Sequence, residues 1–432
     1  MFEKYDAYKD SGVDWIGDIP ADWDALKLKN VAFINPTNTA LSNSLDKNTQ
    51  VCFLAMENVE ANGTVNYQNK RRLASVKSGF TNFIKNDVLV AKITPCFENG
   101  KGALLDQLDS EIGFGSTEFH VLRSKHNCHP KFLYYLTKSH NFMDFGEGMM
   151  IGSAGQKRVP TDFIENFNVA LPNKTLQGEI AKFLDAKTIE IEQVIAIKEQ
   201  QIALLNERKQ IVIQKAVTQG LDPNVPTKES GVEWIGQIPE HWECKPSRYA
   251  FRATKRFKRD GTEIKFSVTQ KWGVIPTDEM KESATQAVSF EGFQICLEDD
   301  LVLNKYKAHL GVFWRAPSRG LITGNYTVFE PLKGINSKYF ELLYHTPVYI
   351  DIFRTIVYGV IEGMMPLYNN DFYDMLSIVP PLEEQLAIVQ YVEEQQKEFS
   401  KIERVFLGQI EKLKEYKTTL INDAVTGKIK VA

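Results

Sequence analysis

The chain has 432 residues and a formal net charge of −4, with 43% hydrophobic and 25% charged residues. This length predicts two or more domains with cores of their own, and the composition is ordinary for a soluble globular protein. No apolar run approaches the roughly 18 residues that a membrane-spanning helix requires, so we expect no contact with a membrane. Affinity for phosphates comes mainly from Lys and Arg. Because the net charge is negative, the chain is not a globally basic nucleic-acid binder. Any contact with phosphates must therefore come from local basic patches.

Five cysteines lie far apart and form no CxxC pair, which fits reduced thiols better than a disulfide framework. The first residues, MFEKYDAYKDSG, are polar and do not resemble a secretory signal. Both features predict a cytoplasmic protein.

The chain contains the same framework twice. Three pairs of similar segments occur: SGVDWIGDIPADWD (11–24) and SGVEWIGQIPEHWE (230–243), LPNKTLQGEIAKFLD (171–185) and VPPLEEQLAIVQYVE (379–393), ERKQIVIQKAVT (207–218) and EYKTTLINDAVT (415–426). The period is about half the chain, which excludes a solenoid of short repeats. The stretches between these segments, 25–170 and 244–378, resemble each other only faintly. A constant framework with two different inserts suits a protein that presents two binding surfaces in one fixed geometry.

The first of these repeated segments carries tryptophan, isoleucine and proline but no catalytic residue. We expect it to form a compact cap that packs on a neighbouring element. Its tryptophans, Trp15, Trp23, Trp234 and Trp242, are then core residues and not a ligand cage.

The two inserts are predicted to be mixed α+β domains that share one fold. Two-residue hairpins are predicted at Asn62-Gly63, Asn99-Gly100 and Asp260-Gly261. Two strand-like runs and one helical run align between the inserts: 87–93 with 300–306, 116–122 with 323–329, and 131–137 with 338–344. The first alignment places Lys92 opposite Lys305.

A long helix is predicted from about Lys174 to Gln219, with a counterpart 208 residues later. Positions spaced alternately four and three apart, from Leu184 to Ala216, are apolar in seven of ten cases, and the same register from Val392 to Ala424 gives seven again. A helix of about 44 residues is about 65 Å long. The matched registers favour an antiparallel coiled coil over the alternative, in which each amphipathic helix packs only on its own domain.

Catalytic motifs are absent from the sequence. It contains no phosphate-binding loop, nucleophile elbow, HExxH motif or dinucleotide-binding glycine run, so we expect a chain without enzymatic activity or cofactor. The one group that resembles metal ligands is His120, His126, Cys128 and His129. Its spacing matches no standard zinc finger and no partner pair follows, so a polar loop is favoured over a metal site.

Basic patches are local. Seven Lys and Arg residues fall within 245–260 with three aromatic neighbours, and two shorter runs occur in the first insert. Such side chains neutralise phosphates or read base edges, whereas the alternative for each run is a solvated surface. The candidate DNA-binding residues are Lys70, Arg71, Arg72, Lys92, Gln156, Lys157, Arg158, Lys255, Arg256, Lys258, Arg259, Lys271, Lys305 and Lys307.

The segments KDSGVDWIGDIPADW and KESGVEWIGQIPEHW, with the Pro-flanked entries into two long helices, resemble the specificity subunits of type I restriction–modification systems over the whole chain. The resemblance implies two target-recognition domains, 1–172 and 220–379, and two conserved helices, 173–219 and 380–432. It implies an α+β fold in which long antiparallel coiled-coil helices join two mixed α/β domains in a pseudo-twofold duplication.

The same resemblance implies the function. Each recognition domain reads one half of an asymmetric, bipartite site in double-stranded DNA, and the helices set the gap and dock two methyltransferase subunits. Those partners bind S-adenosylmethionine and methylate adenine N6, and restriction subunits cleave DNA with ATP and Mg. The loop 357–367 has no basic residue, unlike its counterpart 151–160.

Two alternative functions belong to other classes of protein. One is a coiled-coil scaffold that binds protein partners without reading DNA. The other is a self-sufficient nuclease or methyltransferase, which would need a cofactor site or a carboxylate cluster that the sequence does not contain. Charge reversal of Lys255, Arg256, Lys258 and Arg259 distinguishes DNA reading from scaffolding, because only the former predicts weaker binding and a shallower salt dependence.

Overall fold

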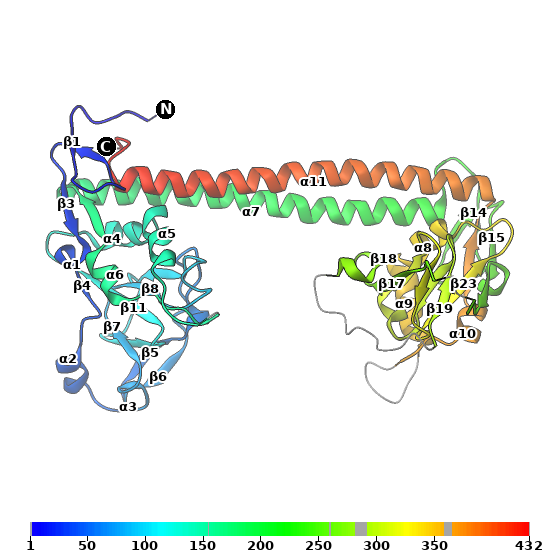
Figure 1. Ribbon diagram of the computed structural model, residues 1–432, viewed down its shortest axis with the longest axis horizontal. Helices are drawn as coiled ribbons and strands as arrows, with labels where there is room; N and C mark the ends of the chain where they lie inside the picture. Colours follow the sequence, from blue (N-terminus) through cyan, green and yellow to red (C-terminus); the bar gives the residue numbers. More distant parts are fainter. Residues whose placement is uncertain (1, 154, 259–260, 281–291, 358–364, 432) are drawn as a thin grey trace. The chain divides into compact units, whose positions relative to one another are not determined.

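The computed structural model describes residues 2–153, 155–258, 261–280, 292–357 and 365–431 (Figure 1). The chain divides into two compact units. Unit 1 comprises 1–198 and 407–432, and unit 2 comprises 199–406. Each long helix contributes one part to each unit. Among the described residues, no helix is both long and apolar enough to cross a bilayer.

Two small antiparallel pairs form the base of each unit. In unit 1, β1 (Tyr8–Asp10) pairs with β2 (Asp18–Pro20), and β3 (Asp24–Lys27) pairs with β12 (Asn168–Leu171). In unit 2, the equivalents are β13 (Thr227–Glu229) with β14 (Gln237–Pro239), and β15 (Glu243–Pro246) with β24 (Leu376–Val379). Each insert therefore begins and ends on adjacent strands of one pair.

The insert of unit 1 contains two four-stranded sheets. One has the order β4-β11-β8-β9, from β4 (Ala32–Ile34), β8 (Val88–Ala91), β9 (Gly102–Leu104) and β11 (Phe119–Ser124). The other has the order β6-β5-β10-β7, from β5 (Gln50–Leu54), β6 (Lys70–Arg72), β7 (Thr81–Phe83) and β10 (Gly113–Gly115). All pairs are antiparallel except β5 with β10, which is parallel.

Unit 2 repeats this topology. Its sheets have the orders β16-β23-β20-β21 and β18-β17-β22-β19, with one parallel pair, β17 with β22. The strands are β16 (Phe251–Thr254), β17 (Ile264–Thr269), β18 (Gly273–Pro276), β19 (Gln294–Cys296), β20 (Leu301–Asn304), β21 (Phe313–Arg315), β22 (Gly320–Ile322) and β23 (Tyr326–Pro331). The shared strand order confirms that two dissimilar inserts have one fold.

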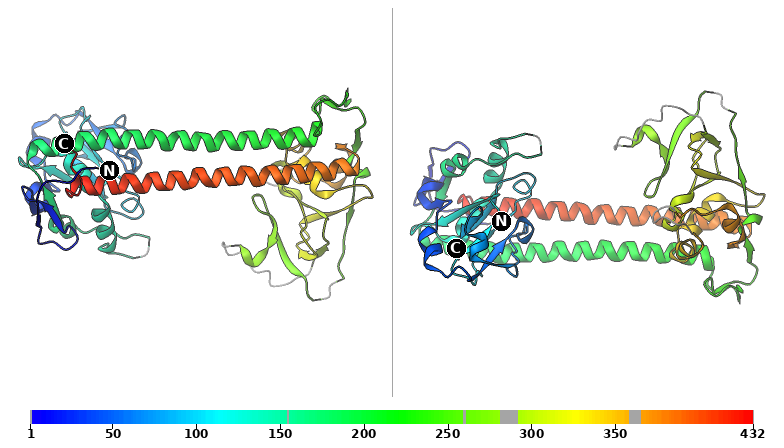
Figure 2. Two further views of the ribbon diagram at one scale, coloured as in Figure 1. Left: turned by 90° about the horizontal axis from the view of Figure 1, so that it is seen from above. Right: turned by 90° about the horizontal axis from the view of Figure 1, so that it is seen from below.

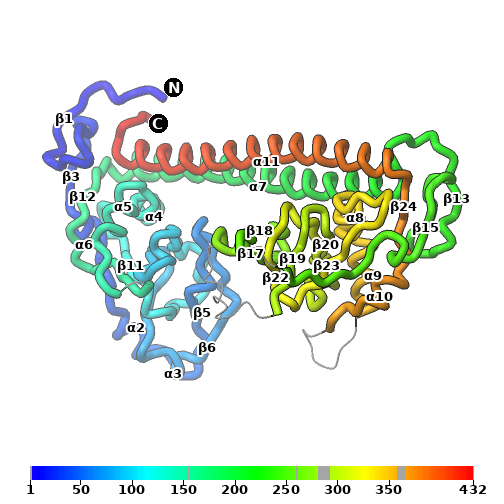
Figure 3. The backbone as a smooth tube through the Cα atoms, turned by 45° about the vertical axis from the view of Figure 1, so that its right-hand side comes forward, coloured from blue at the N-terminus to red at the C-terminus, as the bar shows by residue number. Residues whose placement is uncertain are grey.

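Short helices complete both inserts. Those of unit 1 are α1 (Leu28–Val31), α2 (Thr39–Ser44), η1 (Met56–Asn58), α3 (Leu73–Val76), α4 (Pro130–Thr137), α5 (His140–Gly148) and α6 (Thr161–Asn166). Those of unit 2 are η2 (Ser247–Tyr249), η3 (Thr277–Glu279), η4 (Lys305–Leu310), α8 (Ser337–Tyr344), α9 (Pro347–Ile356) and α10 (Asn369–Asp374). Within unit 1, α4 and α5 lie beside the long helices, whereas β6 lies far from them (Figure 3).

The two long helices are α7 (Lys174–Gln219, 46 residues) and α11 (Leu382–Val425, 44 residues). In unit 1, the Lys417 Nζ of α11 lies 2.5 Å from Glu192 Oε1 of α7, and Leu184 shares a core with Ala424. In unit 2, the core joins the end of α7 to the start of α11 (Figure 2). All twenty seam positions are buried or half-buried, so the antiparallel register read from the sequence is confirmed.

A buried glutamine ties each insert to its long helix. Gln177 is fully buried and bonds to three backbone groups: His129 N–H at 2.7 Å, Asn127 C=O at 3.0 Å and Pro172 C=O at 2.8 Å. Gln385, 208 residues later, repeats this pattern with Asn336 N–H at 2.8 Å, Gly334 C=O at 3.1 Å and Pro380 C=O at 2.8 Å. Because both amide groups are satisfied, each helix starts at a fixed position against its insert.

The repeated tryptophan segments are core, as predicted. Trp23 and Trp242 are fully buried, whereas Trp15 and Trp234 are half-buried. Each cap packs on the end of a long helix. A Cβ on Gly427 would meet the Pro20 ring at 2.4 Å, which leaves no room for a side chain there.

Asn62-Gly63 and Asn99-Gly100 lie in turns, but neither forms the predicted two-residue hairpin: Val59 bridges Val65, and residues 92–101 separate β8 from β9. Gly63 and Gly100 have φ angles of +90° and +69°, conformations that glycine adopts without strain. Asp260 lies outside the described residues.

Candidate nucleic-acid interface

Four of the candidate residues come together in unit 1. The segment after β8 pairs with the loop before α6: Thr94 N–H donates to Lys157 C=O at 3.0 Å, and Val159 N–H donates to Lys92 C=O at 2.9 Å. Lys157 N–H donates in turn to Thr94 Oγ1 at 3.1 Å. This pairing places Gln156 and Arg158 on the same short ladder as Lys92, which the sequence did not predict.

The ladder carries more positive than negative charge. Arg158 bonds to both carboxylate oxygens of Glu118, at 2.9 and 2.8 Å, and this contact lowers the pKa of Glu118. Lys92 Nζ donates to Thr117 C=O at 3.0 Å. Burial lowers the pKa of Lys92, Glu118 opposes this effect and Arg158 adds to it. With Lys157 exposed beside them, three cations face one acid, which suits an anionic ligand.

His120 holds this ladder in place. Its Nε2 lies 2.9 Å from Val159 C=O, and its Nδ1 lies 3.2 Å from Asn35 Nδ2. Burial lowers the pKa of His120 to about 4, so the ring is neutral near pH 7, donating from Nε2 and accepting at Nδ1. The sequence grouped His120 with possible metal ligands. The structure instead makes it a positioning residue for the Lys157 loop.

The other three members of that group, His126, Cys128 and His129, have separate surroundings. His129 Nδ1 accepts from Lys131 N–H at 3.3 Å and caps α4, while Cys128 is buried in the core and His126 is exposed. No group of three His, Cys, Asp or Glu side chains suited to a metal ion occurs in the described part of the chain.

Acid is expected to destabilise unit 1 through His120. The folded-state pKa of about 4 lies below the ordinary 6.5, so the stabilisation is complete above pH 6.5 and is lost as the pH falls toward 4. The difference corresponds to about 3 kcal/mol. Urea unfolding of the wild type and of His120→Gln at pH 7.5 and pH 4 measures this. An equal loss of stability in both proteins would contradict this role of His120.

The first basic run lies on another sheet. Lys70, Arg71 and Arg72 form β6, the edge strand of the sheet containing β5. Lys70 Nζ lies 2.5 Å from Asp109 Oδ2, and the Arg71 guanidinium carbon lies 3.7 Å from the Phe53 ring centroid. Two of the three cations therefore already have a side-chain partner, and Arg72 is exposed.

The long basic run of unit 2 is partly neutralised by carboxylates, three of which lie far away in the sequence. Its four paired cations are Lys245 with Glu243, Arg248 with Asp374, Arg252 with Glu330, and Arg256 with Asp300. Arg256 NH1 lies 2.5 Å from Asp300 Oδ2, and burial raises the pKa of Asp300 despite this contact. Lys255 and Lys258 are exposed, and Arg259 lies outside the described residues.

The remaining candidates are dispersed over unit 2. Lys271 occupies the turn between β17 and β18, with its ammonium 5.3 Å from the centroid of the exposed Trp272 ring. Lys305 begins η4 and its C=O accepts from Leu367 N–H at 2.9 Å, as that of Lys92 accepts from Val159. The two aligned lysines are thus equivalent in backbone position, and Lys307 is exposed two residues on. Within loop 357–367, residues 358–364 lie outside the described residues.

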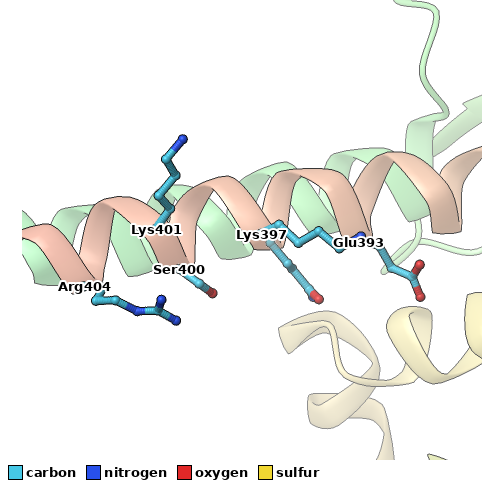
Figure 4. A pocket seen from close by; sticks show the side chains of 6 residues that line it. Glu393, Lys397, Ser400, Lys401 and Arg404 are labelled. Atoms are coloured by element: carbon cyan, nitrogen blue, oxygen red, sulfur yellow. The ribbon is translucent and has the colours of Figure 1, made fainter.

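The long helices present two further surfaces. An open recess along α11 in unit 2 is lined by Glu393, Gln396, Lys397, Ser400, Lys401 and Arg404, so cations dominate it (Figure 4). On α7, an apolar stripe with a spacing of seven residues consists of Ile197, Leu204 and Ile211, whose exposed fractions are 53%, 56% and 46%. This stripe lies beside the seam and was not predicted.

Comparison with known proteins finds a matching family model and similar specificity subunits. Residues 20–205 match the family described as type I restriction modification DNA specificity domain. The chain is 32% identical over 197 residues to the type I restriction enzyme EcoEI specificity subunit of Escherichia coli, covering 45% of this chain and 32% of that protein. It is 33% identical over 233 residues to the EcoAI specificity subunit of the same species, covering 52% and 37%. The chain spans about a third of the length of these curated relatives.

Solved structures share the fold across nearly the whole chain. One, described as the structural basis underlying complex assembly and conformational transition of the type I R-M system, has a TM-score of 0.71 at 16% identity and covers 94% of this chain and 98% of its own. The HsdS subunit from Thermoanaerobacter tengcongensis has a TM-score of 0.56 at 17% identity, covering 95% and 98%. Residues 20–205 thus resemble the type I restriction modification DNA specificity domain, and the chain shares its fold with these solved structures.

Proposed function

We propose that this chain is the DNA-specificity subunit of a type I restriction–modification complex, in which each recognition domain reads one half of an asymmetric, bipartite site. The observation that carries the proposal is the duplicated anchoring of two dissimilar inserts. Gln177 and Gln385 make the same three hydrogen bonds, and the pairs β3–β12 and β15–β24 close the two inserts in the same way. The similarity to the EcoEI and EcoAI specificity subunits supports the same role.

We assign the recognition domains to 1–172 and 220–379, and the conserved helices to 173–219 and 380–432. In the first domain, the ladder carrying Lys92, Lys157 and Arg158 is the best DNA-contact candidate, because it combines excess positive charge with a rigid backbone. In the second domain, the exposed Lys255, Lys258, Lys271 and Lys307 are favoured over Arg256, which unlike Arg158 is half-buried against a buried carboxylate, Asp300.

The helices then act as the spacer between half-sites and as the docking surface for two methyltransferase subunits. The exposed apolar stripe of α7 supports this role, because apolar side chains at a spacing of seven residues suit packing against a partner helix. Adenine methylation with S-adenosylmethionine takes place in those partners, and DNA cleavage with ATP and Mg takes place in restriction subunits. The chain itself contributes recognition in the cytoplasm, without enzymatic activity and without contact with a membrane.

Methylome sequencing tests this function. The expected result, in a host that carries the chain with its methyltransferase, is an N6-methyladenine motif of two short blocks around a fixed gap, lost when this chain is deleted. If no motif depends on the chain while it still co-purifies with partner subunits, it is a protein scaffold instead.

A further inference from the structure

A second group of cations lies in unit 1, apart from every residue considered so far. Lys27 Nζ and Lys29 Nζ lie 3.2 and 3.3 Å from one and the same oxygen, Asn166 Oδ1. Lys125 Nζ lies 2.6 Å from Lys29 C=O and 4.9 Å from the ring centroid of the exposed Phe33. We call Lys27, Lys29 and Lys125, with Asn166 between the first two, the lysine cluster.

The lysine cluster lacks a counter-charge. Among the described residues, none of its three ammonium groups lies within the 4.0 Å of a carboxylate that defines an ion pair. Lys27 and Lys29 share a neutral amide oxygen, so their charges lie at most about 6.5 Å apart and repel each other. Asn166 orients the two side chains without neutralising them. Such a pair is stabilised when an anion binds to both.

The duplication provides an internal comparison. Leu28 N–H donates to Phe167 C=O at 2.8 Å, and Ser247 N–H donates to Met375 C=O at the same distance, so the two positions correspond. The residue that corresponds to Asn166 is then Asp374, and it forms an ion pair with Arg248, the counterpart of Lys29. The second unit thus neutralises this position with a carboxylate, whereas the first holds more cations around an amide. If this position served folding alone, the two units would not need different net charges there.

We propose that the lysine cluster binds a backbone phosphate of the DNA duplex at a point separate from the ladder of Lys92. This inference rests on the proposed function. Strand β11 runs between the two places, because Lys92 N–H donates to Glu118 C=O just before β11 and Lys125 directly follows it. Six strand residues span about 20 Å, which is about six nucleotides at 3.4 Å each. The first domain therefore contacts the DNA backbone beyond its half-site.

The chemistry favours a phosphate. Lysine ammonium groups bind phosphates as point charges and need no bidentate geometry. Phosphate contacts fix the register of a protein on the DNA duplex but do not distinguish one base sequence from another. Loss of the lysine cluster should therefore weaken binding to every sequence equally and leave the methylated motif unchanged.

The test uses the chain in complex with its methyltransferase subunits and a duplex containing the motif found by methylome sequencing. The triple variant Lys27→Gln, Lys29→Gln, Lys125→Gln is compared with the wild type for Kd as a function of NaCl concentration. Each lost phosphate contact reduces the slope of log Kd against log salt by about 0.9. Because one phosphate contact is lost, we expect a slope shallower by about 0.9 and a Kd raised about tenfold or more at low salt, with the same motif methylated.

Two further variants separate this role from a folding defect. Asn166→Asp has nearly the same shape and introduces the carboxylate of unit 2, so it should reduce the slope by about 1. The double variant Arg248→Gln, Asp374→Asn removes a neutral pair at the equivalent position and should leave the slope unchanged.

Three outcomes would overturn the inference. Unchanged slope and affinity in both lysine-cluster variants, with the wild-type motif intact, would make the cluster a solvated surface. Loss of methyltransferase co-purification with unchanged DNA affinity would make it a protein contact. If the wild type directs no motif, the proposed function itself fails, and the two failures are distinguishable.

Discussion

Exchange of residues 28–167 for the corresponding segment of another specificity subunit is expected to change one block of the methylated motif and to leave the other block and the gap unchanged. The insert enters after β3 and leaves before β12, which are paired strands. Leu28 N–H closes the base by donating to Phe167 C=O at 2.8 Å. An exchange that begins at Leu28 and ends at Phe167 leaves the framework strands β3 and β12 in place. Methylome sequencing reads both blocks and the gap in one experiment.

The incoming segment must also fit the long helix. Tyr135 OH donates to Asp185 Oδ1 at 2.7 Å, and Lys131 Nζ lies 2.5 Å from Asp185 Oδ2, so α4 docks on α7 through one carboxylate. A donor segment should keep both side chains. Exchange of 247–375 is the matched control and should change only the other block. A change in both blocks, or in neither, would contradict the modular assignment.

Periodicity made the framework predictable. The repeats and the heptad register are patterns of many residues, so a few exceptions such as Thr188 or Glu403 do not hide them. The seam positions are buried or half-buried in both helices, and the aligned runs became β8 and β20, β11 and β23, and α4 and α8. Burial of an apolar face at a fixed spacing follows from local sequence alone.

Electrostatic pairing was not predictable in this way. The run 245–260 reads as strongly basic because its neutralising carboxylates come from elsewhere: Asp300 and Glu330 belong to or adjoin neighbouring strands, and Asp374 closes α10. Conversely, Lys27 and Lys29 look ordinary in the sequence, and only the fold brings Asn166 between them. Contacts between residues 40 to 140 positions apart leave no local signal, so counting charges along the sequence does not show which cations are paired.

The two repeated tryptophan segments also differ in contacts that only the structure shows. Trp242 Nε1 donates to Glu384 Oε2 at 2.9 Å, whereas the equivalent Trp23 Nε1 is buried without a hydrogen-bond partner among the described residues. The position that corresponds to Glu384 holds Leu176. The first unit thus packs this tryptophan by apolar contact alone, although the segments around it read as copies.

Replacing Leu204 and Ile211 with Glu is expected to release the methyltransferase subunits. Both side chains are about half exposed in this chain, at 56% and 46%, so the substitutions should change its free energy of unfolding by only about 0.5 kcal/mol each. In a helix–helix interface, the same charges would be buried against apolar side chains, at a cost of about 2 kcal/mol or more per site. The expected loss of affinity is on the order of 100-fold or more.

Co-purification of the methyltransferase with tagged chain measures this loss, and methylation of the motif should disappear with it. The control variant Gln201→Glu, Gln210→Glu adds equal charge at exposed polar positions of the same part of α7. It should retain both partner binding and methylation. If the Leu204 and Ile211 variant still co-purified as well as the control, the apolar stripe would not be the docking surface. The cation-lined recess of α11, which offers polar contacts in place of apolar ones, would then be the surface to test by charge reversal of Lys397 and Lys401.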